Sequence, residues 1–164
     1  MSAIEDTISH ISKTVTAMPT AILNAFPDLS SAGFVDIDRM GGTRFELGAM
    51  VGRSRVFEVD LNRQSVVPLA QGLAVPQSFD VSAALRVRYD AQGQSVRDDI
   101  KARAMREQIV IVKALTASDW PSVNGLVNLI VGQGTITAGT AIDDAGSNYD
   151  FIISEVVVDF SVDM

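Results

Sequence analysis

The side chains that could perform catalysis or bind a metal are few and widely spread. The chain has one histidine, His10, and no cysteine among its 164 residues. A zinc site built from paired histidines or thiolates therefore cannot form within one chain, and no cysteine nucleophile exists. A Ser-His-Asp arrangement would have to use His10, which lies between Ser9 and Ile11 in an amphipathic segment. We interpret His10 as a residue on a helix surface.

Carboxylates occur in pairs along the chain. Asp36 and Asp38, two apart in a strand, would share a face and could hold a hard cation or exchange protons. A solvated strand face accounts for the same spacing, and Asp143-Asp144 before Gly146 is typical of a turn. The remaining pairs are Glu58/Asp60, Asp98/Asp99 and Asp159/Asp163. We therefore expect no catalytic residue, no metal site and no cofactor, and the protein is interpreted as a non-enzyme.

Composition narrows the function classes. Thirteen Lys and Arg against twenty Asp and Glu give a net charge of −7, which disfavours wrapping nucleic acid. The first residues are acidic where a signal peptide is basic, and no apolar stretch approaches the ~20 residues that span a bilayer. We expect a protein of an aqueous compartment with no membrane partner.

Hydrophobic periodicity predicts the elements that position these residues. Apolar residues at helical spacing predict an N-terminal helix, with Pro19 marking either a kink or the start of a second helix. They are Ile4, Ile8, Ile11, Val15, Met18 and Ile22. From residue 34 the period changes to two, and residues 34–38 and 43–47 flank Gly41-Gly42 as a hairpin. Residues 55–61 predict a further strand.

The clearest strand is 79–89, with Val81, Leu85 and Val87 on one face and Arg86 and Arg88 on the other. A capping box at Ser95–Asp98 predicts a helix to about Ala117. Residues 134–143 and a long last strand predict a C-terminal hairpin, and residues 123–131 fit a helix or a strand. The order favours a single α+β domain over 1–164, with a mainly antiparallel sheet packed by an N-terminal and a central helix.

Two features are candidates for contact with other chains. Residues 62–78 carry three prolines or glycines and no clear period, so we expect a long loop whose apolar residues meet a partner. Those residues are Val66, Val67, Leu69, Leu73 and Val75. Arg86 and Arg88 are expected to pair with acids across the sheet or on a neighbouring subunit, the candidates being Asp36, Asp38 and Asp159.

The order of elements resembles the tail terminator proteins of long-tailed bacteriophages. The resemblance lies in the N-terminal amphipathic helix, the helix 96–115 directly after strand 79–89, and the closing turn Asp143–Gly146 with its last strand 152–164. It implies a structural virion protein that forms a ring, a homohexamer, in the neck of the tail. The implied partners are the tail tube protein and the head-completion or connector protein. DNA would pass through the ring without specific binding, and assembly would take place in the bacterial cytoplasm.

Three alternatives stay open. Other head–tail connector or neck subunits share parts of this plan, and a ring subunit of a tailocin or a secretion system has no distinguishing sequence feature. A small-ligand or enzymatic domain would need titratable residues converging under segment 62–78, which offers only Arg63.

Overall fold

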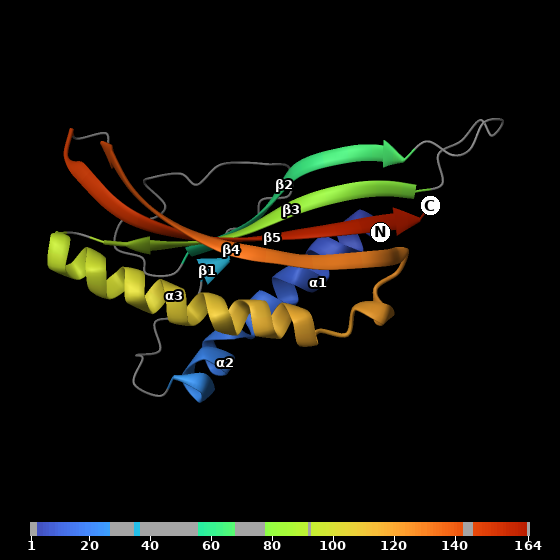
Figure 1. Cartoon of the computed structure of the whole chain (residues 1–164), viewed down its shortest axis with the longest axis horizontal. Coiled ribbons are helices and arrows are strands. Elements are labelled where there is room, and N and C mark those ends of the chain that lie inside the picture. Colours follow the sequence, from blue (N-terminus) through green and yellow to red (C-terminus); the bar gives the residue numbers. More distant parts are fainter. Residues whose placement is uncertain are drawn as a thin grey trace.

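Three helices lie on one side of a curved, twisted sheet (Figure 1). This computed structural model describes residues 3–26, 35–36, 56–67, 78–91, 93–142 and 146–163. The helices are α1 (Ala3–Thr16), α2 (Met18–Ala25) and α3 (Gln94–Ala117), followed by a short 3-10 helix, η2 (Trp120–Ser122). The strands are β1 (Val35–Asp36), β2 (Val56–Val67), β3 (Ser78–Asp90), β4 (Leu126–Ile142) and β5 (Asn148–Asp163). The predicted α+β class is confirmed.

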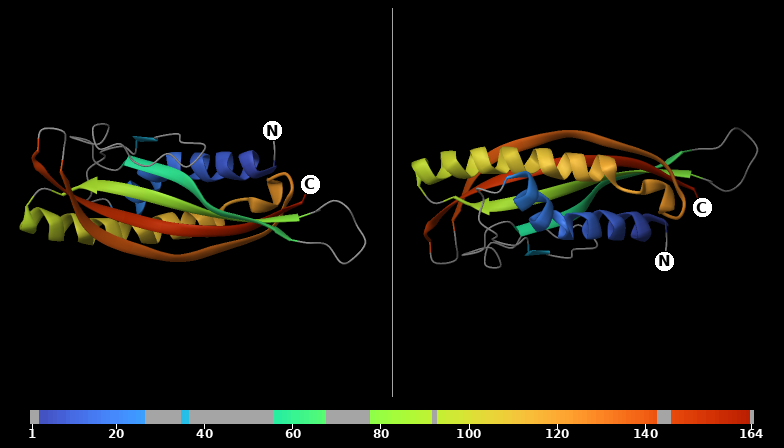
Figure 2. Two further views of the ribbon diagram at one scale, coloured as in Figure 1. Left: turned by 90° about the horizontal axis from the view of Figure 1, so that it is seen from above. Right: turned by 90° about the horizontal axis from the view of Figure 1, so that it is seen from below.

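The sheet has the strand order β1-β2-β3-β5-β4. Every described pair except one is antiparallel; β1 runs parallel to β2 through Val35↔Val56 and Asp36↔Phe57. β4 and β5 form the predicted C-terminal hairpin. The two views in Figure 2 show β3 and β5 in the middle of the sheet, with α3 running along them.

Alternation on β3 determines the core, as predicted. Val81, Leu85 and Val87 are each at most 3% exposed and face the helices. Because successive side chains of a strand point to opposite faces, β5 contributes its even-numbered residues from Ile152 to Val162 to the same core. α3 covers them with the side chains of Ala104, Ile111 and Leu115, and α1 adds Ile8 and Ile11.

Pro19 starts a second helix rather than kinking the first. It is the second residue of α2, where its missing N–H is one that the helix leaves unpaired in any case. Of the two readings of the sequence, the structure supports the second helix.

The predicted capping box at Ser95 is wrong. α3 already begins at Gln94, and its N-cap is Gly93, with φ of 78° and no side-chain cap. Glycine adopts this left-handed conformation without a steric penalty, so the chain turns from β3 into α3 over very few residues. The Gly93 carbonyl then accepts the first bond, from the Arg97 N–H at 2.9 Å.

The predicted loop 62–78 is too long at both ends. β2 continues to Val67, and β3 begins at Ser78, with Val66 paired to Phe79 and Val67 to Ser78. A register shift between Leu61 and Arg63 interrupts the pairing with β3, so the register of residues 56–61 does not continue in phase. Leu69, Leu73 and Val75 lie outside the described residues, as does most of the predicted hairpin 34–47.

Residues 126–131 belong to a strand, which resolves the open choice, and residues 123–125 form the turn before it. Trp120 begins η2 after the end of α3, and its indole N–H donates to the Leu115 carbonyl at 2.5 Å. Gly125, with φ of 72°, directly precedes β4, and a Cβ there would lie 3.0 Å from the Asp163 carbonyl oxygen and against the side chain of Ala3. Leu126–Ile142 forms β4. Within the described ranges, the structure contains no helix that is both long and apolar enough to cross a membrane.

The core assignment predicts a contrast between two aliphatic truncations. Leu85→Ala should lower the free energy of unfolding by ~2–5 kcal/mol, because it leaves a cavity under α3. Val96→Ala should change it little, since Val96 is 45% exposed on α3. Urea unfolding measures both. Equal losses for the two variants would contradict the assignment.

Candidate functional site

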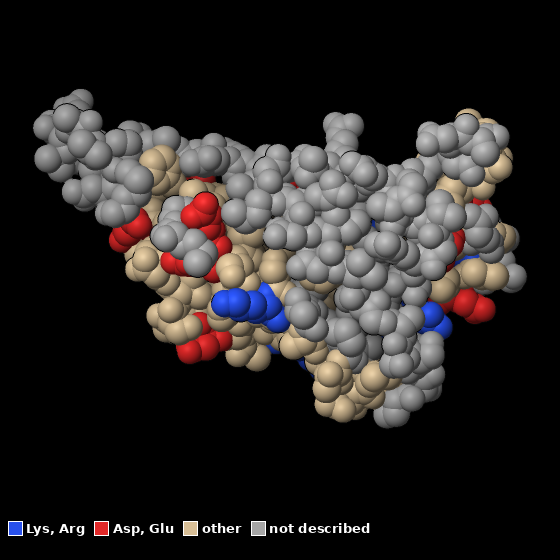
Figure 3. Space-filling model, turned by 180° about the vertical axis from the view of Figure 1, so that it is seen from behind, with Lys and Arg blue, Asp and Glu red and all other residues tan. Residues whose placement is uncertain are grey.

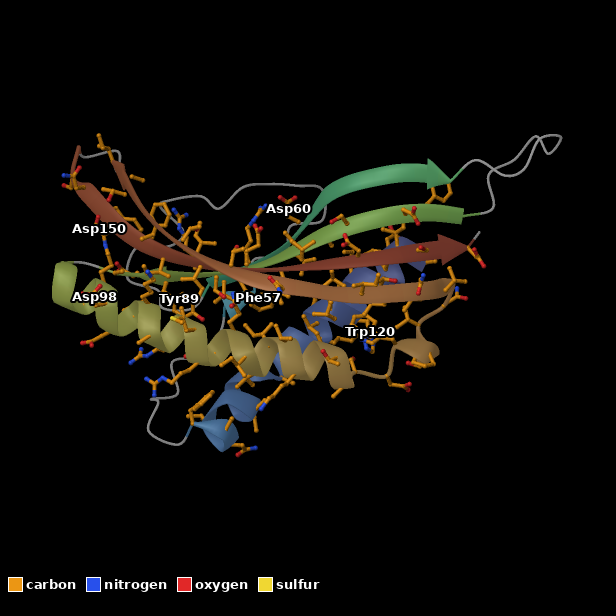
Figure 4. The ribbon with its side chains drawn as sticks, in the orientation of Figure 1. Phe57, Asp60, Tyr89, Asp98, Trp120 and Asp150 are labelled. Atoms are coloured by element: carbon orange, nitrogen blue, oxygen red, sulfur yellow. The ribbon has the colours of Figure 1, made fainter. Side chains whose placement is uncertain are left out.

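Arg86 is the centre of a charge network on the face of the sheet that points away from the helices. Its guanidinium contacts the carboxylates of Asp60 at 2.7 Å and Glu155 at 2.6 Å. The strand register accounts for both partners: Glu155 lies directly opposite Arg86 on β5, and Asp60 lies diagonally across on β2, where its own register partner is Ala84. Figure 4 shows Asp60 on the opposite side of the sheet from Tyr89 and Trp120.

Arg86 keeps its positive charge within this network. Burial alone would lower the pKa of Arg86, but the hydrogen bonds that it donates to Glu155 and Asp60, with the charges of these carboxylates, outweigh burial and raise the pKa above its ordinary value. Arg86 therefore joins β2, β3 and β5 as a permanent cation between two anions. The three strands keep a net negative charge at this point.

Arg88 shares the face of Arg86 but not its environment. It is only 7% exposed, and its guanidinium carbon lies 4.0 Å from the centre of the Phe151 ring. A cation above an aromatic face is stabilised by the ring quadrupole. Packing on this ring is thus one contact of Arg88, and its expected ion-pairing role stays a prediction.

Of the three acids named from the sequence, Asp159 is the one whose side chain the structure describes, and its register position on β5 is four residues from Glu155, the residue opposite Arg86. Asp159 is exposed beside β3 residue Ser82, and Asp38 lies outside the described residues. Asp36 lies in β1, two strands away from β3. Asp60 and Glu155 are described ion-pair partners of Arg86, and the expected contacts of Arg86 and Arg88 with a neighbouring subunit stay a prediction.

Asp159 instead lines an open pocket of about 360 Å³ on the same face. Asp80, Asn128 and Ser161 also line it, and the Ser161 hydroxyl donates to Asp80 at 2.8 Å. Asp80 and Asp159 thus place two carboxylates at this end of the face.

His10 is not a simple surface residue, because the fold brings it against Ser118. The distance from His10 Nε2 to Ser118 Oγ is 2.5 Å, and Ser118 Oγ also lies 3.2 Å from Thr14 Oγ1. Trp120 packs on the imidazole with ring centroids 4.7 Å apart. Since His10 and Ser118 are 108 positions apart, no local spacing could have revealed the pair.

The Ser118–His10 pair is better suited to holding helices together than to catalysis. Ser118 caps the C-terminus of α3, where the helix dipole is negative and disfavours the oxyanion of an acyl-transfer reaction. The Thr14 hydroxyl donates to the His10 carbonyl at 2.9 Å, which completes a closed set of contacts between α1 and the end of α3.

Sequence reasoning missed two polar residues of α3. Glu107 is fully buried, and the Tyr89 hydroxyl donates to it at 2.8 Å. The Gln108 amide donates to the Thr135 carbonyl and to Ser154 Oγ, both at 2.9 Å. Position 107 lies on the same helix face as Ala104 and Ile111. An acid at a position where the helical pattern expects an apolar residue could therefore have been recognised from the sequence as a buried polar group.

The position of Gln108 also accounts for a shift in the register with which β4 pairs with β5. The register of β4 shifts between Val131 and Gly134, and a Cβ at Gly134 would collide with the Gln108 amide. Glycine thus lets the amide reach the strand backbone at the bulge.

The described part of the chain offers surfaces rather than a reactive cluster. No group of three or more His, Asp or Glu in it could hold a metal ion. The sequence matches no known protein family and no curated protein.

Removing Arg86 should expose the repulsion between its two partners. Arg86→Ala should lower the free energy of unfolding by ~1–3 kcal/mol, since two partly buried carboxylates lose their shared cation. Adding Asp60→Asn to that variant should recover part of the loss. Urea unfolding at neutral pH measures both steps, and a double variant no more stable than the single one would contradict the network.

Tyr149 should make the fold sensitive to alkali. Burial, followed by the nearby Asp90 charge, raises the pKa of Tyr149 above its ordinary value of 10.0. The folded state thus holds the phenol proton more tightly than the unfolded state, so stability falls as pH rises above 10. Thermal unfolding should show a steeper loss for the native protein than for Tyr149→Phe. Identical alkaline slopes would contradict this.

Proposed function

We propose that the protein is a non-enzymatic ring subunit that caps a phage tail tube and joins it to the head connector. The observation that carries the proposal is the two-faced sheet. One face is sealed by α1 and α3. The other carries Asp60 and Glu155, which Arg86 bridges, and Asp80 and Asp159 at the pocket further along the sheet. The order of elements, which resembles the tail terminator family, supports the same function.

A subunit with one acidic face is suited to line a channel through which DNA passes. In a ring with its helices outward, the acidic sheet faces would line the axis, and carboxylates there repel phosphate. Figure 3 shows carboxylates at several separate places on the side of the molecule turned away from the viewer in Figure 1. Six copies is the number that the resemblance implies.

The capping role predicts an effect on tube length. Added to polymerising tail tube protein, the native chain should stop elongation and give short tubes with a ring at one end. Electron microscopy measures the length distribution against tubes grown without it. Tubes that continue to lengthen at saturating protein would reject the terminator role and leave a connector subunit as the alternative.

The channel predicts a position-dependent effect of charge. Asp80→Lys with Asp159→Lys should make ring-capped tubes retain duplex DNA at low salt, because the basic groups would face the axis. The matched control, Asp99→Lys with Asp119→Lys, makes the same charge change at exposed positions of α3 and its C-terminal connection. A filter-binding assay across a salt series compares them. Equal DNA retention by both variants would contradict the inward orientation.

A further inference from the structure

β4 is a sheet edge that carries neither proline nor charge, although two register shifts interrupt its pairing with β5. It pairs with β5, and the described residues place no strand on its other side. Edge strands of monomeric proteins are usually interrupted by proline or carry charges that prevent pairing with other chains. The seventeen residues of β4 contain no proline and no charged side chain, although 20% of the whole chain is charged. A strand of this length and composition is suited to pairing with another strand.

The flank of α3 beside β4 is apolar as well. Met105 and Ile109 are each 53% exposed, and Val112 follows at the spacing that keeps all three on one side of the helix. Gln108, between them, donates to the β4 backbone at Thr135, which places this flank along the strand. Together, the outer edge of β4 and these three side chains form a surface that we call the β4 edge strip.

An apolar groove extends the β4 edge strip at one end. It has a volume of about 560 Å³, and Trp120, Pro121, Val127 and Leu129 are among its lining residues. Val127 is 54% exposed. The strip therefore combines unpaired backbone with exposed apolar side chains, and its occupant must supply both a strand edge and apolar contacts.

We propose that the β4 edge strip binds β2 of a second copy of this chain. At the far side of the sheet, β1 pairs with Val56 and Phe57 only, so β2 from Glu58 to Val67 has β3 as its described neighbour. α1 packs beside β2. The β2 side of the sheet therefore has a helix next to its strand, as the β4 side has α3. A single chain thus carries the two surfaces that would meet in this contact, the β4 edge strip on one side of the sheet and β2 on the other.

Strand directions permit this pairing, and closure into a ring favours it over β4 with β4, which would join the copies as a closed dimer. In the order β2-β3-β5-β4, each neighbour is antiparallel, so β4 runs opposite to β2. A second copy in the same orientation would therefore continue the antiparallel alternation. The contact joins two different surfaces, which is what a closed ring requires. The inference rests on the ring of the proposed function but not on the phage tail.

Cross-linking can identify the contact because the chain has no native cysteine. Asn128 on β4 and Ser65 on β2 lie at the same level of the sheet through Ser161 and Asp80. A short bismaleimide should convert the double variant Asn128→Cys, Ser65→Cys into a ladder of covalent oligomers. Each single variant should give no covalent dimer.

A matched pair of substitutions tests the apolar half of the contact. Ile109→Lys should weaken self-association at least about tenfold, because the ammonium group would have to be desolvated in the interface. Val96→Lys, on another side of the same helix and similarly exposed, should leave it unchanged. Sedimentation velocity measures association, and circular dichroism confirms that both variants are folded.

Three results would overturn the proposal. Covalent dimers from Asn128→Cys alone would show that β4 pairs with itself. Native protein that stays monomeric at its highest soluble concentration, with no ladder, would show that the strip does not bind a second copy. Equal association of the two lysine variants would place the contact elsewhere. None of these results bears on tube capping, which the tube-length assay decides separately.

Discussion

The pairing of β3 with β5 constrains everything else in the structure. Their register runs unbroken from Ser78↔Asp163 to Asp90↔Phe151, so the faces of both strands are fixed along their full length. One face collects the aliphatic side chains under α1 and α3, and the other collects the charges. Arg86 lies opposite Glu155 as a direct consequence. A one-residue slip would bury the arginine and expose the core, which makes the register the condition for both the fold and the acidic face.

Polar groups, rather than apolar ones, fix the position of α3 along the sheet. Aliphatic contacts tolerate sliding, whereas the Tyr89–Glu107 hydrogen bond and the reach of Gln108 into the β4 bulge are each satisfied at one position. A buried carboxylate that lost its partner would carry a large desolvation penalty. The same placement sets Met105 and Ile109 beside the edge of β4. The surface proposed for a second copy thus depends on contacts made inside the subunit.

The sequence predicted those elements in which a single period persists. Strand 79–89, its buried residues and the covering face of α3 followed from uninterrupted alternation and helical spacing. Prediction failed where the phase changes: register shifts at Leu61/Arg63 and in β4 interrupt the alternation, so the strands appeared shorter or ambiguous. The start of α3 was misplaced because Gly93 turns the chain by its backbone, without a capping side chain. In the candidate site, the pairing of Arg86 with Asp60 and Glu155 could not be chosen from the sequence, since strand register rather than proximity in sequence selects the partners. The expected intersubunit role of Arg86 and Arg88 stays a prediction.

The central position of β5 has a consequence for how the chain acquires its structure. β3 ends at Asp90, but its partner begins only at Asn148, after α3 and β4 have been made. Contacts between segments so far apart form slowly, because a long loop must close before they contribute free energy. During synthesis, β3 and β4 would therefore each wait for the strand that comes between them, with their apolar faces uncovered. The order of elements makes this subunit a candidate for chaperone assistance while it is being translated.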